Sequence, residues 1–263
     1  MALLLPESGA LLFEAGAGAA PAPPARLDTG GARAVAAAWH PRGGSLFAAA
    51  GADGTIHVVG GCDDSWGVSG SRVEAPASTP RPPFPSAAKR IRPGASWPSH
   101  PPLALAFGPG DALIALYGDG RVLASAPPYV HAAPLPLPAD RAATLAQPPG
   151  DDTVLFLAGP GAASGGGVRA SVWRLAAGPG GSLTANRAAT SGAPAPRSWL
   201  SFGEATPVNW TASISPGGGL AAVAPGGGPL ALFAVGAASL SRLALTPPPS
   251  GPPPSTDANA SVA

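Results

Sequence analysis

Residues that commonly carry chemistry are sparse in this chain of 263 residues. The histidines, the cysteine and the lysine are His40, His57, His100, His131, Cys62 and Lys89. No histidine stands at metal-ligand spacing from another histidine, a cysteine or a glutamate, so the sequence predicts neither a metal nor a cofactor. His40 precedes a proline in a turn and His57 lies in a strand-like run, so we interpret both as structural.

The carboxylate pairs and the glycine-rich run do not form a convincing active site. Asp63-Asp64 and Asp151-Asp152 lie in turn-rich segments, where an aspartate accepts hydrogen bonds from its own backbone. Adjacent residues of a strand also point to opposite faces, which suits an acid–base pair poorly. Ser164 lies in a glycine run without the lysine of a phosphate loop or the following helix of a nucleophile elbow. We therefore expect a protein that is not an enzyme.

A basic cluster and several tryptophans are the candidate partner-binding residues. The cluster lies in a segment rich in proline and serine, where it would contact an acidic partner, act as a nuclear localisation element, or keep a linker soluble. The tryptophans fall outside the clear strand-like runs, where they would anchor a partner or pack on the core. These candidates are Lys89, Arg90, Arg92, Trp66, Trp97 and Trp199.

Composition argues against several classes of partner. Charged residues make up 11% of the chain and the formal net charge is +1, so no broad field attracts nucleic acid or an anionic membrane. A lone cysteine excludes an intramolecular disulfide and fits a reducing compartment. No apolar run approaches the roughly 20 residues of a membrane helix, and the N-terminus resembles no secretory signal. We expect an intracellular protein whose partners are other proteins.

A repeated pattern of short apolar runs and turns predicts the fold. Residues 35–59 contain three strand-length runs separated by a His-Pro turn and by Asp53-Gly54, and Asp-Gly favours a type I′ hairpin turn with positive φ at both central residues. Residues 103–125 repeat the order with Asp119-Gly120, and residues 209–235 repeat it with glycines. Runs at 153–159 and 168–175 suggest another unit, in which Val172-Trp173 takes the outer-strand position. Residues 3–5 and 10–13 suggest an initial hairpin.

Such units bury their apolar faces against their neighbours, so the pattern predicts an all-β propeller-like domain over residues 1–245. Residues 60–102 lack apolar periodicity and predict a disordered insertion without strands. Residues 246–263 predict a disordered proline-rich tail.

The units resemble blades of the WD40 family. The likeness rests on His40-Pro41, Asp53-Gly54, Asp119-Gly120 and Ser171-Val172-Trp173. No unit carries both the Gly-His and the Trp-Asp pairs of that family, and the spacing is irregular. Blades of about 40 to 45 residues allow four or five in this chain, which predicts a divergent or partial propeller. The ring is then completed elsewhere, the chain is part of a longer one, or further blades are too degenerate to recognise.

A narrower resemblance is to the WD40 subunit of the Mediator tail module, Mediator subunit sixteen. It rests on Val172-Trp173 followed by Gly178-Pro179-Gly180 and on a long Pro/Ser-rich insertion after the first blade. The resemblance implies a nuclear transcription coactivator that contacts other subunits of a complex. The alternatives are a generic cytosolic WD40 scaffold and a propeller hydrolase whose site is assembled from loop residues.

Overall fold

The computed structural model describes residues 2–5, 9–12, 25–27, 31–42, 46–60, 70–74, 87–94, 96–137, 142–160, 168–179, 182–191, 210–225 and 229–244. For residues 2–5, 9–12, 25–27, 70–74 and 87–88 it describes the backbone alone. Within these ranges the chain is almost entirely β-strand, which confirms the all-β prediction. None of the helices in this part of the chain has the length and apolar character to span a membrane.

Four antiparallel units of four strands follow one another along the chain. The first contains β4 (Ala34–Trp39), β5 (Phe47–Gly51), β6 (Ile56–Val59) and β8 (Ala87–Ile91). The second contains β9 (Pro102–Gly108), β10 (Ala112–Tyr117), β11 (Val122–Ser125) and β12 (Ala133–Pro134), with the short 3-10 turn η2 (Pro109–Asp111) between β9 and β10. The third contains β13 (Thr144–Ala146), β14 (Val154–Pro160), β15 (Val168–Ala177) and β16 (Leu183–Ser191). The fourth contains β17 (Thr211–Ile214), β18 (Leu220–Ala224), β19 (Ala231–Val235) and β20 (Leu240–Leu243).

An N-terminal group of strands extends the first sheet. The strands β1 (Ala2–Leu5), β2 (Gly9–Leu12), β3 (Ala25–Leu27) and β7 (Gly70–Glu74) continue from the edge of β8 and complete an eight-stranded sheet. This sheet curls back on itself, because β1 contacts β4 at the opposite edge. The predicted initial hairpin is confirmed as the antiparallel pair β1–β2.

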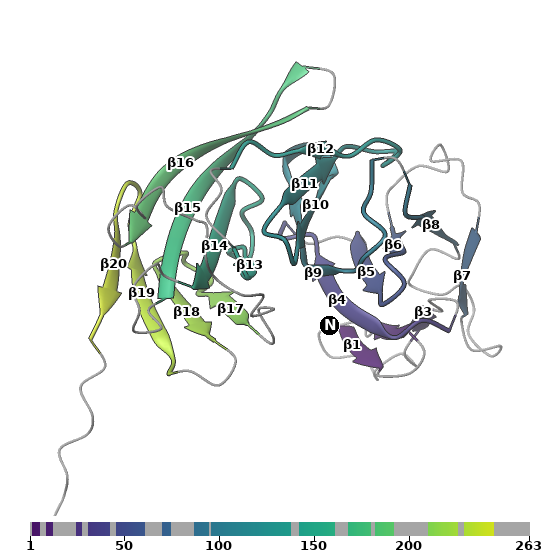
Figure 1. Cartoon of the computed structure of the whole chain (residues 1–263), viewed down its shortest axis with the longest axis horizontal. Helices are drawn as coiled ribbons and strands as arrows, with labels where there is room; N and C mark the ends of the chain where they lie inside the picture. Colours follow the sequence, from purple (N-terminus) through teal and green to yellow (C-terminus); the bar gives the residue numbers. More distant parts are fainter. Residues whose placement is uncertain are drawn as a thin grey trace, which may run out of the picture.

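The sheets stand side by side around a common centre (Figure 1). The first strand of each unit contacts the first strand of the next, in the order β4, β9, β13 and β17, so these inner strands surround the centre. The arrangement of four-stranded antiparallel sheets around shared inner strands is that of a propeller.

Three apolar cores hold neighbouring sheets together, one between each successive pair. Alternate residues of a strand contribute to different cores because successive side chains point to opposite faces. On β10, Leu113 and Tyr117 lie in the core shared with the first unit, whereas Ile114 and Leu116 lie in the core shared with the third. All four are fully buried. The middle sheets are therefore buried on both faces, which explains their nearly continuous apolar runs.

The Asp-Gly turns form where expected, but they are not type I′ turns. Gly54 has φ +80° and Gly120 has φ +82°, while neither Asp53 nor Asp119 has a positive φ. The Asp53 carboxylate instead accepts hydrogen bonds from the backbone N–H (3.0 Å) and hydroxyl (2.9 Å) of Thr55. The Gly54 N–H donates a hydrogen bond to the Gly51 carbonyl and closes a tight turn. Gly54 is the last residue of this turn, and it is the only one that needs a positive φ.

The sequence expectations fail at the fourth strand of each unit and at β13, the first strand of the third unit. Strands β7 and β8 lie inside residues 60–102, so the prediction that this segment lacks strands is wrong there. Strand β8 forms because its backbone pairs with β6 and its Ile91 is buried in the first core. Trp173 lies on β15, the third strand of its unit, and β16 takes the outer position instead. Residues 246–263 lie outside the described residues.

Candidate functional site

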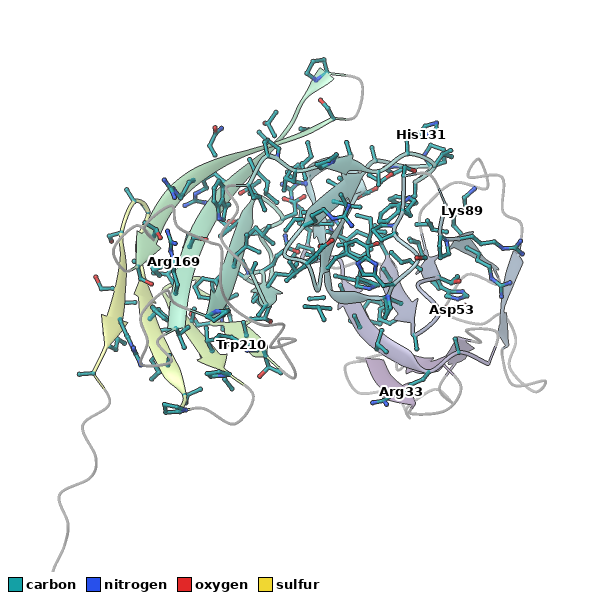
Figure 2. All side chains as sticks on the ribbon, viewed as in Figure 1. Arg33, Asp53, Lys89, His131, Arg169 and Trp210 are labelled. Carbon is teal, nitrogen blue, oxygen red and sulfur yellow. The ribbon has the colours of Figure 1, made fainter. Side chains whose placement is uncertain are left out.

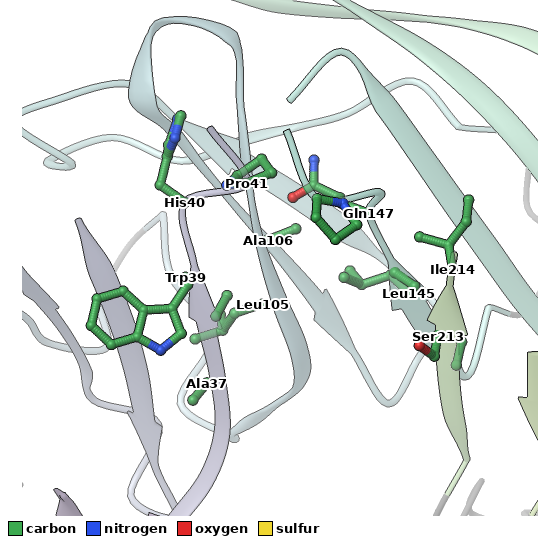
Figure 3. A pocket seen from close by; sticks show the side chains of 14 residues that line it. Ala37, Trp39, His40, Pro41, Leu105, Ala106, Leu145, Gln147, Ser213 and Ile214 are labelled. Carbon is green, nitrogen blue, oxygen red and sulfur yellow. The ribbon is translucent and has the colours of Figure 1, made fainter. Parts of the chain in front are cut away.

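The inner strands enclose a groove of about 400 Å³, which we call the axial groove. Its walls are the ends of β4, β9 and β13, together with β17, so every four-stranded unit contributes to it. Figure 3 shows side chains from all four strands converging on this space. The lining residues are Ala37, Ala38, Trp39, His40, Pro41, Leu105, Ala106, Leu145, Ala146, Gln147, Pro149, Ala212, Ser213 and Ile214.

Small apolar side chains dominate the walls of the axial groove. Alanines from all four inner strands leave the backbone close to the open space, whereas the larger residues Leu105, Leu145 and Ile214 border it but are buried in the three cores between the sheets. The polar side chains in the wall belong to His40, Gln147 and Ser213, apart from the indole N–H of Trp39. Such a lining suits an apolar ligand fixed by few polar contacts.

Gln147 fastens two walls of the groove together. Its Oε1 accepts a hydrogen bond from the Phe107 backbone N–H (3.1 Å) and its Nε2 donates one to the Phe107 carbonyl (2.6 Å). Strands β9 and β13 belong to different sheets, so the side-chain amide acts here as one further strand residue would. The second polar bridge between walls is the backbone hydrogen bond from Gly150 N–H to the Pro41 carbonyl (2.6 Å).

A charged cluster lies beside the groove where turns from three units meet. Asp152 is 3% exposed, and its Oδ1 lies 2.7 Å from Arg42 Nη2. His40 Nε2 lies 3.5 Å from Asp111 Oδ1 and 4.0 Å from Asp152 Oδ2. The His40 ring also contacts Phe107, with ring centroids 5.6 Å apart. The cluster therefore joins the turn after β4 to the turns that follow β9 and β13.

This cluster is not a metal centre. The Arg42 guanidinium already neutralises Asp152, and a cation placed beside both would be repelled. Across the ranges given above, no group of three or more histidine, cysteine, aspartate or glutamate side chains could hold a metal ion.

The basic candidates occupy a strand and its immediate end, not an exposed linker. Lys89 and Arg90 are half-buried residues of β8, and Arg92 is exposed just beyond it. Figure 2 shows Lys89 near the edge of the molecule formed by β7 and β8, whereas the axial groove lies at the centre. Their role in binding stays a prediction.

The tryptophan candidates have different fates. Trp97 is 4% exposed and belongs to the first core, so it packs inside the molecule and offers no exposed anchor. Its burial follows from its position beside the sheet formed by β9 to β12, whose residues fill the same core. Trp66 and Trp199 lie outside the described residues.

The remaining chemical candidates resolve in part. Asp151 accepts hydrogen bonds from the backbone N–H (2.8 Å) and hydroxyl (2.6 Å) of Thr153, which confirms its predicted turn role. Asp152 differs from its neighbour, because it is buried and ion-paired. Asp63, Asp64 and Ser164 lie outside the described residues.

Sequence reasoning missed Gln147 and the partners of His40. Both sets of contacts join different units of the fold. Gln147, for example, bonds to the backbone of Phe107, which lies 40 residues earlier in the chain. A signal for Gln147 exists, since a glutamine at the end of an apolar run and before two prolines is an unusual place for a polar side chain.

Comparison with known proteins gives distant structural likenesses. No family model and no curated protein matches the chain. PorZ, a surface component of the type-IX secretion system of Porphyromonas gingivalis, matches at 13% identity and a TM-score of 0.43, over 90% of this chain and 26% of that one. A putative 6-phosphogluconolactonase from Bacteroides fragilis matches at 15% identity and a TM-score of 0.46, over 89% of this chain and 63% of that one. YCF48 bound to the D1 peptide matches at 12% identity and a TM-score of 0.40, over 88% of this chain and 68% of that one.

The chain thus spans about a quarter of the length of PorZ and 63% of that of the lactonase-like protein. With these TM-scores, the assignment of the fold depends on the sheet topology of the chain itself. In its described part the chain is propeller-like, with one eight-stranded and three four-stranded antiparallel sheets.

Proposed function

We propose that this chain is a non-enzymatic protein-interaction scaffold that holds an extended segment of a partner protein in the axial groove. The single observation that carries the proposal is the groove itself, a space of about 400 Å³ that is bordered by residues with small apolar side chains from four sheets. Because three apolar cores fix the walls, the groove is preformed and its ligand need not order it.

The inner strands also offer free edges, apart from Phe107 on β9, whose backbone N–H and C=O are bonded to Gln147. Each of β4, β9, β13 and β17 is an edge strand with a hydrogen-bonded neighbour on one side only. An edge strand presents N–H and C=O groups that an extended peptide can pair with, while alternate side chains of the peptide enter the apolar lining. The small wall residues favour a peptide with small or medium apolar side chains.

The test is to fill the groove from one wall. Ala37 is a half-buried lining residue of β4, and Val35 is a 37% exposed residue of the same strand that does not line the groove. The wild-type protein and the variants Ala37→Arg and Val35→Arg should each be immobilised and exposed to nuclear extract. The proteins that each one retains are then quantified by mass spectrometry. We expect retention of groove partners to fall at least about tenfold in Ala37→Arg, the equivalent of about 1.4 kcal/mol, and to persist in Val35→Arg. Equal retention by all three proteins would refute binding in the groove.

The cellular setting is a separate proposal. The likeness to the WD40 subunit of the Mediator tail module supports a nuclear coactivator that contacts other subunits of a complex, with a cytosolic scaffold as the second candidate. Retention of Mediator tail subunits from nuclear extract by the wild-type protein and not by Ala37→Arg would support the nuclear role. Their absence from the retained fraction would remove it.

The absence of catalysis needs its own measurement. A hydrolase-substrate panel should show no turnover by the purified protein above buffer. Turnover that disappears in Asp151→Asn or Ser164→Ala would overturn the non-enzymatic proposal.

A further inference from the structure

Among the residues that the structure describes, the fourth sheet is covered on one face only. Its residues alternate between burial and exposure: Ala221 and Val223 on β18 are buried, whereas Leu220 is 53% exposed and Ala222 is half-exposed. On β19, Phe233 is fully buried and its neighbours are half-exposed. The buried positions belong to the core shared with the third sheet.

The middle sheets show what this uncovered face lacks. Both sets of alternate residues on β10 are fully buried, because a neighbouring sheet packs on each side. The fourth sheet has such a neighbour on one side, and its free side retains the apolar character of a buried face. Three of the six large hydrophobic residues exposed in the described part of the chain, Leu220, Leu230 and Leu243, belong to this sheet or directly precede its strand β19.

The pairing register arranges the uncovered face as alternating large and small side chains. Leu220 lies opposite Ala234, and Ala222 lies opposite Leu232. Leu232 in turn lies opposite Leu243 on β20. We call these residues, together with Thr211, Ser213, Ala224 and Ser241 on the same side of the sheet, the terminal face. Leucines project from it next to hollows over alanines, so an identical face turned over by a twofold rotation can place its leucines in those hollows.

The charges of the sheet also favour association with an identical face. Arg242 lies opposite Phe233 in the register, so it belongs to the side that faces the third sheet. The terminal face contains serine, threonine, alanine and leucine residues without a charged one. Two copies can therefore approach without the like-charge repulsion that usually opposes self-association.

We propose that the terminal face is a self-association surface, on which the sheet β17–β20 of a second copy of this chain packs face to face. Four strands spaced about 4.8 Å apart and five residues long at about 3.3 Å per residue give a footprint of roughly 300 Å². This footprint is smaller than the roughly 800 Å² per partner of stable complexes, so the dimer is weak and concentration-dependent. The terminal face shares Ser213 with the axial groove, but its leucines do not line the groove, so the inference does not require the groove to bind a partner.

Sedimentation velocity of the full chain tests the proposal, over concentrations up to about 0.5 mM, where a dimer of micromolar to submillimolar affinity is populated. We expect the wild-type protein to shift from monomer to dimer over this range. Leu232→Lys places a charge at the centre of the face and should weaken the dimer at least about tenfold, or about 1.4 kcal/mol. The matched control is Val130→Lys, at an apolar residue that is 54% exposed outside this sheet, and it should dimerise as the wild type does.

Two results would overturn the proposal. One is a wild-type protein that stays monomeric throughout, which would leave the face to a different partner or to another segment of the chain. The other is undiminished dimerisation of Leu232→Lys. Circular dichroism of each variant verifies folding, and Leu243→Lys on the outer strand is the second variant should Leu232→Lys unfold. Retention of groove partners by Leu232→Lys, measured as above, separates failure of this surface from failure of the groove.

Discussion

Gln147 offers the sharpest test of how the axial groove is held open. Its amide makes two hydrogen bonds to the backbone of Phe107, a residue that is fully buried. Replacement by alanine leaves an N–H and a C=O of β9 without their partner. Leaving one buried polar group unsatisfied costs about 1–3 kcal/mol, and water in the groove can reach this site, so the low end applies to each group.

The expected loss of stability for Gln147→Ala is therefore about 2 kcal/mol. For a protein with 150–250 ordered residues that unfolds in one step, this loss lowers Tm by roughly 4–8 °C. Gln147→Glu separates the two bonds, because a carboxylate can accept from the Phe107 N–H but cannot donate to the carbonyl. We expect the glutamate variant to regain stability as the pH falls towards about 4.3, the ordinary carboxyl pKa of the unfolded chain, because the folded state binds the missing proton more tightly.

The assay is urea unfolding followed by circular dichroism. The control is Thr184→Ala, which removes an exposed hydrogen bond to the Ala176 carbonyl and should change the unfolding free energy by less than about 0.5 kcal/mol. A loss in Gln147→Ala no larger than that of the control would refute the view that the amide joins the sheets. Loss of the acid recovery in Gln147→Glu would refute the assignment of donor and acceptor.

Other predictions follow from single groups. Burial raises the pKa of Tyr117 to about 12, while the charge of Arg121 lowers it slightly and that of Asp119 raises it slightly. The folded state therefore keeps a proton that the unfolded state loses near pH 10. Stability should then be unaffected below pH 10 and fall as the pH rises from about 10 to about 12, and Tyr117→Phe should flatten this fall in urea unfolding titrations; an unchanged slope would contradict it. Gly54→Ala combines φ +80° with a Cβ 2.8 Å from a backbone oxygen, whereas Gly110→Ala has φ +69° and open space, so thermal unfolding should show the larger loss at Gly54, by about 1 kcal/mol or more, and equal losses would contradict the steric argument. Asp152→Asn removes the charge that pairs with Arg42 and should lower the unfolding free energy by about 1–2 kcal/mol in low salt, while an unchanged value would mean that the exposed arginine contributes nothing.

The sequence was sufficient for the first three strands of the first, second and fourth units because their signals are local, whereas β13, the first strand of the third unit, was not predicted. Asp53-Gly54 and Asp119-Gly120 each mark a turn between apolar runs, and the strands on both sides form as predicted. The outer strands carry a weaker signal. On β16, the pattern of residues is mostly polar and its side chains are largely exposed, so pairing with β15 is what makes it a strand. Such a strand depends on its neighbour more than on its own composition.

The candidate site was less accessible to prediction, because nothing within one unit indicates it. The axial groove exists only where the ends of four strands from four units meet, and each contributes ordinary apolar residues such as Leu105 or Leu145. Likewise, His40 sits before Pro41 as its turn pattern suggests, but its contacts with Asp111 and Asp152 come from other units. Residue types alone cannot show which residues of different units come into contact.

The contacts between units also account for a propeller-like arrangement without the Trp-Asp pair of WD40 repeats. The units are joined instead by the Gln147 amide on Phe107, by the Arg42–Asp152 ion pair, and by the apolar cores. None of these joints requires a fixed number of residues between units, because each links a turn or an inner strand to its spatial neighbour. Irregular spacing along the chain is thus compatible with regular packing in space, and the segments between units can vary in length at a small cost in loop entropy. The inner strands and the turns that follow them, where the polar joints lie, are therefore the part of the fold that must stay fixed.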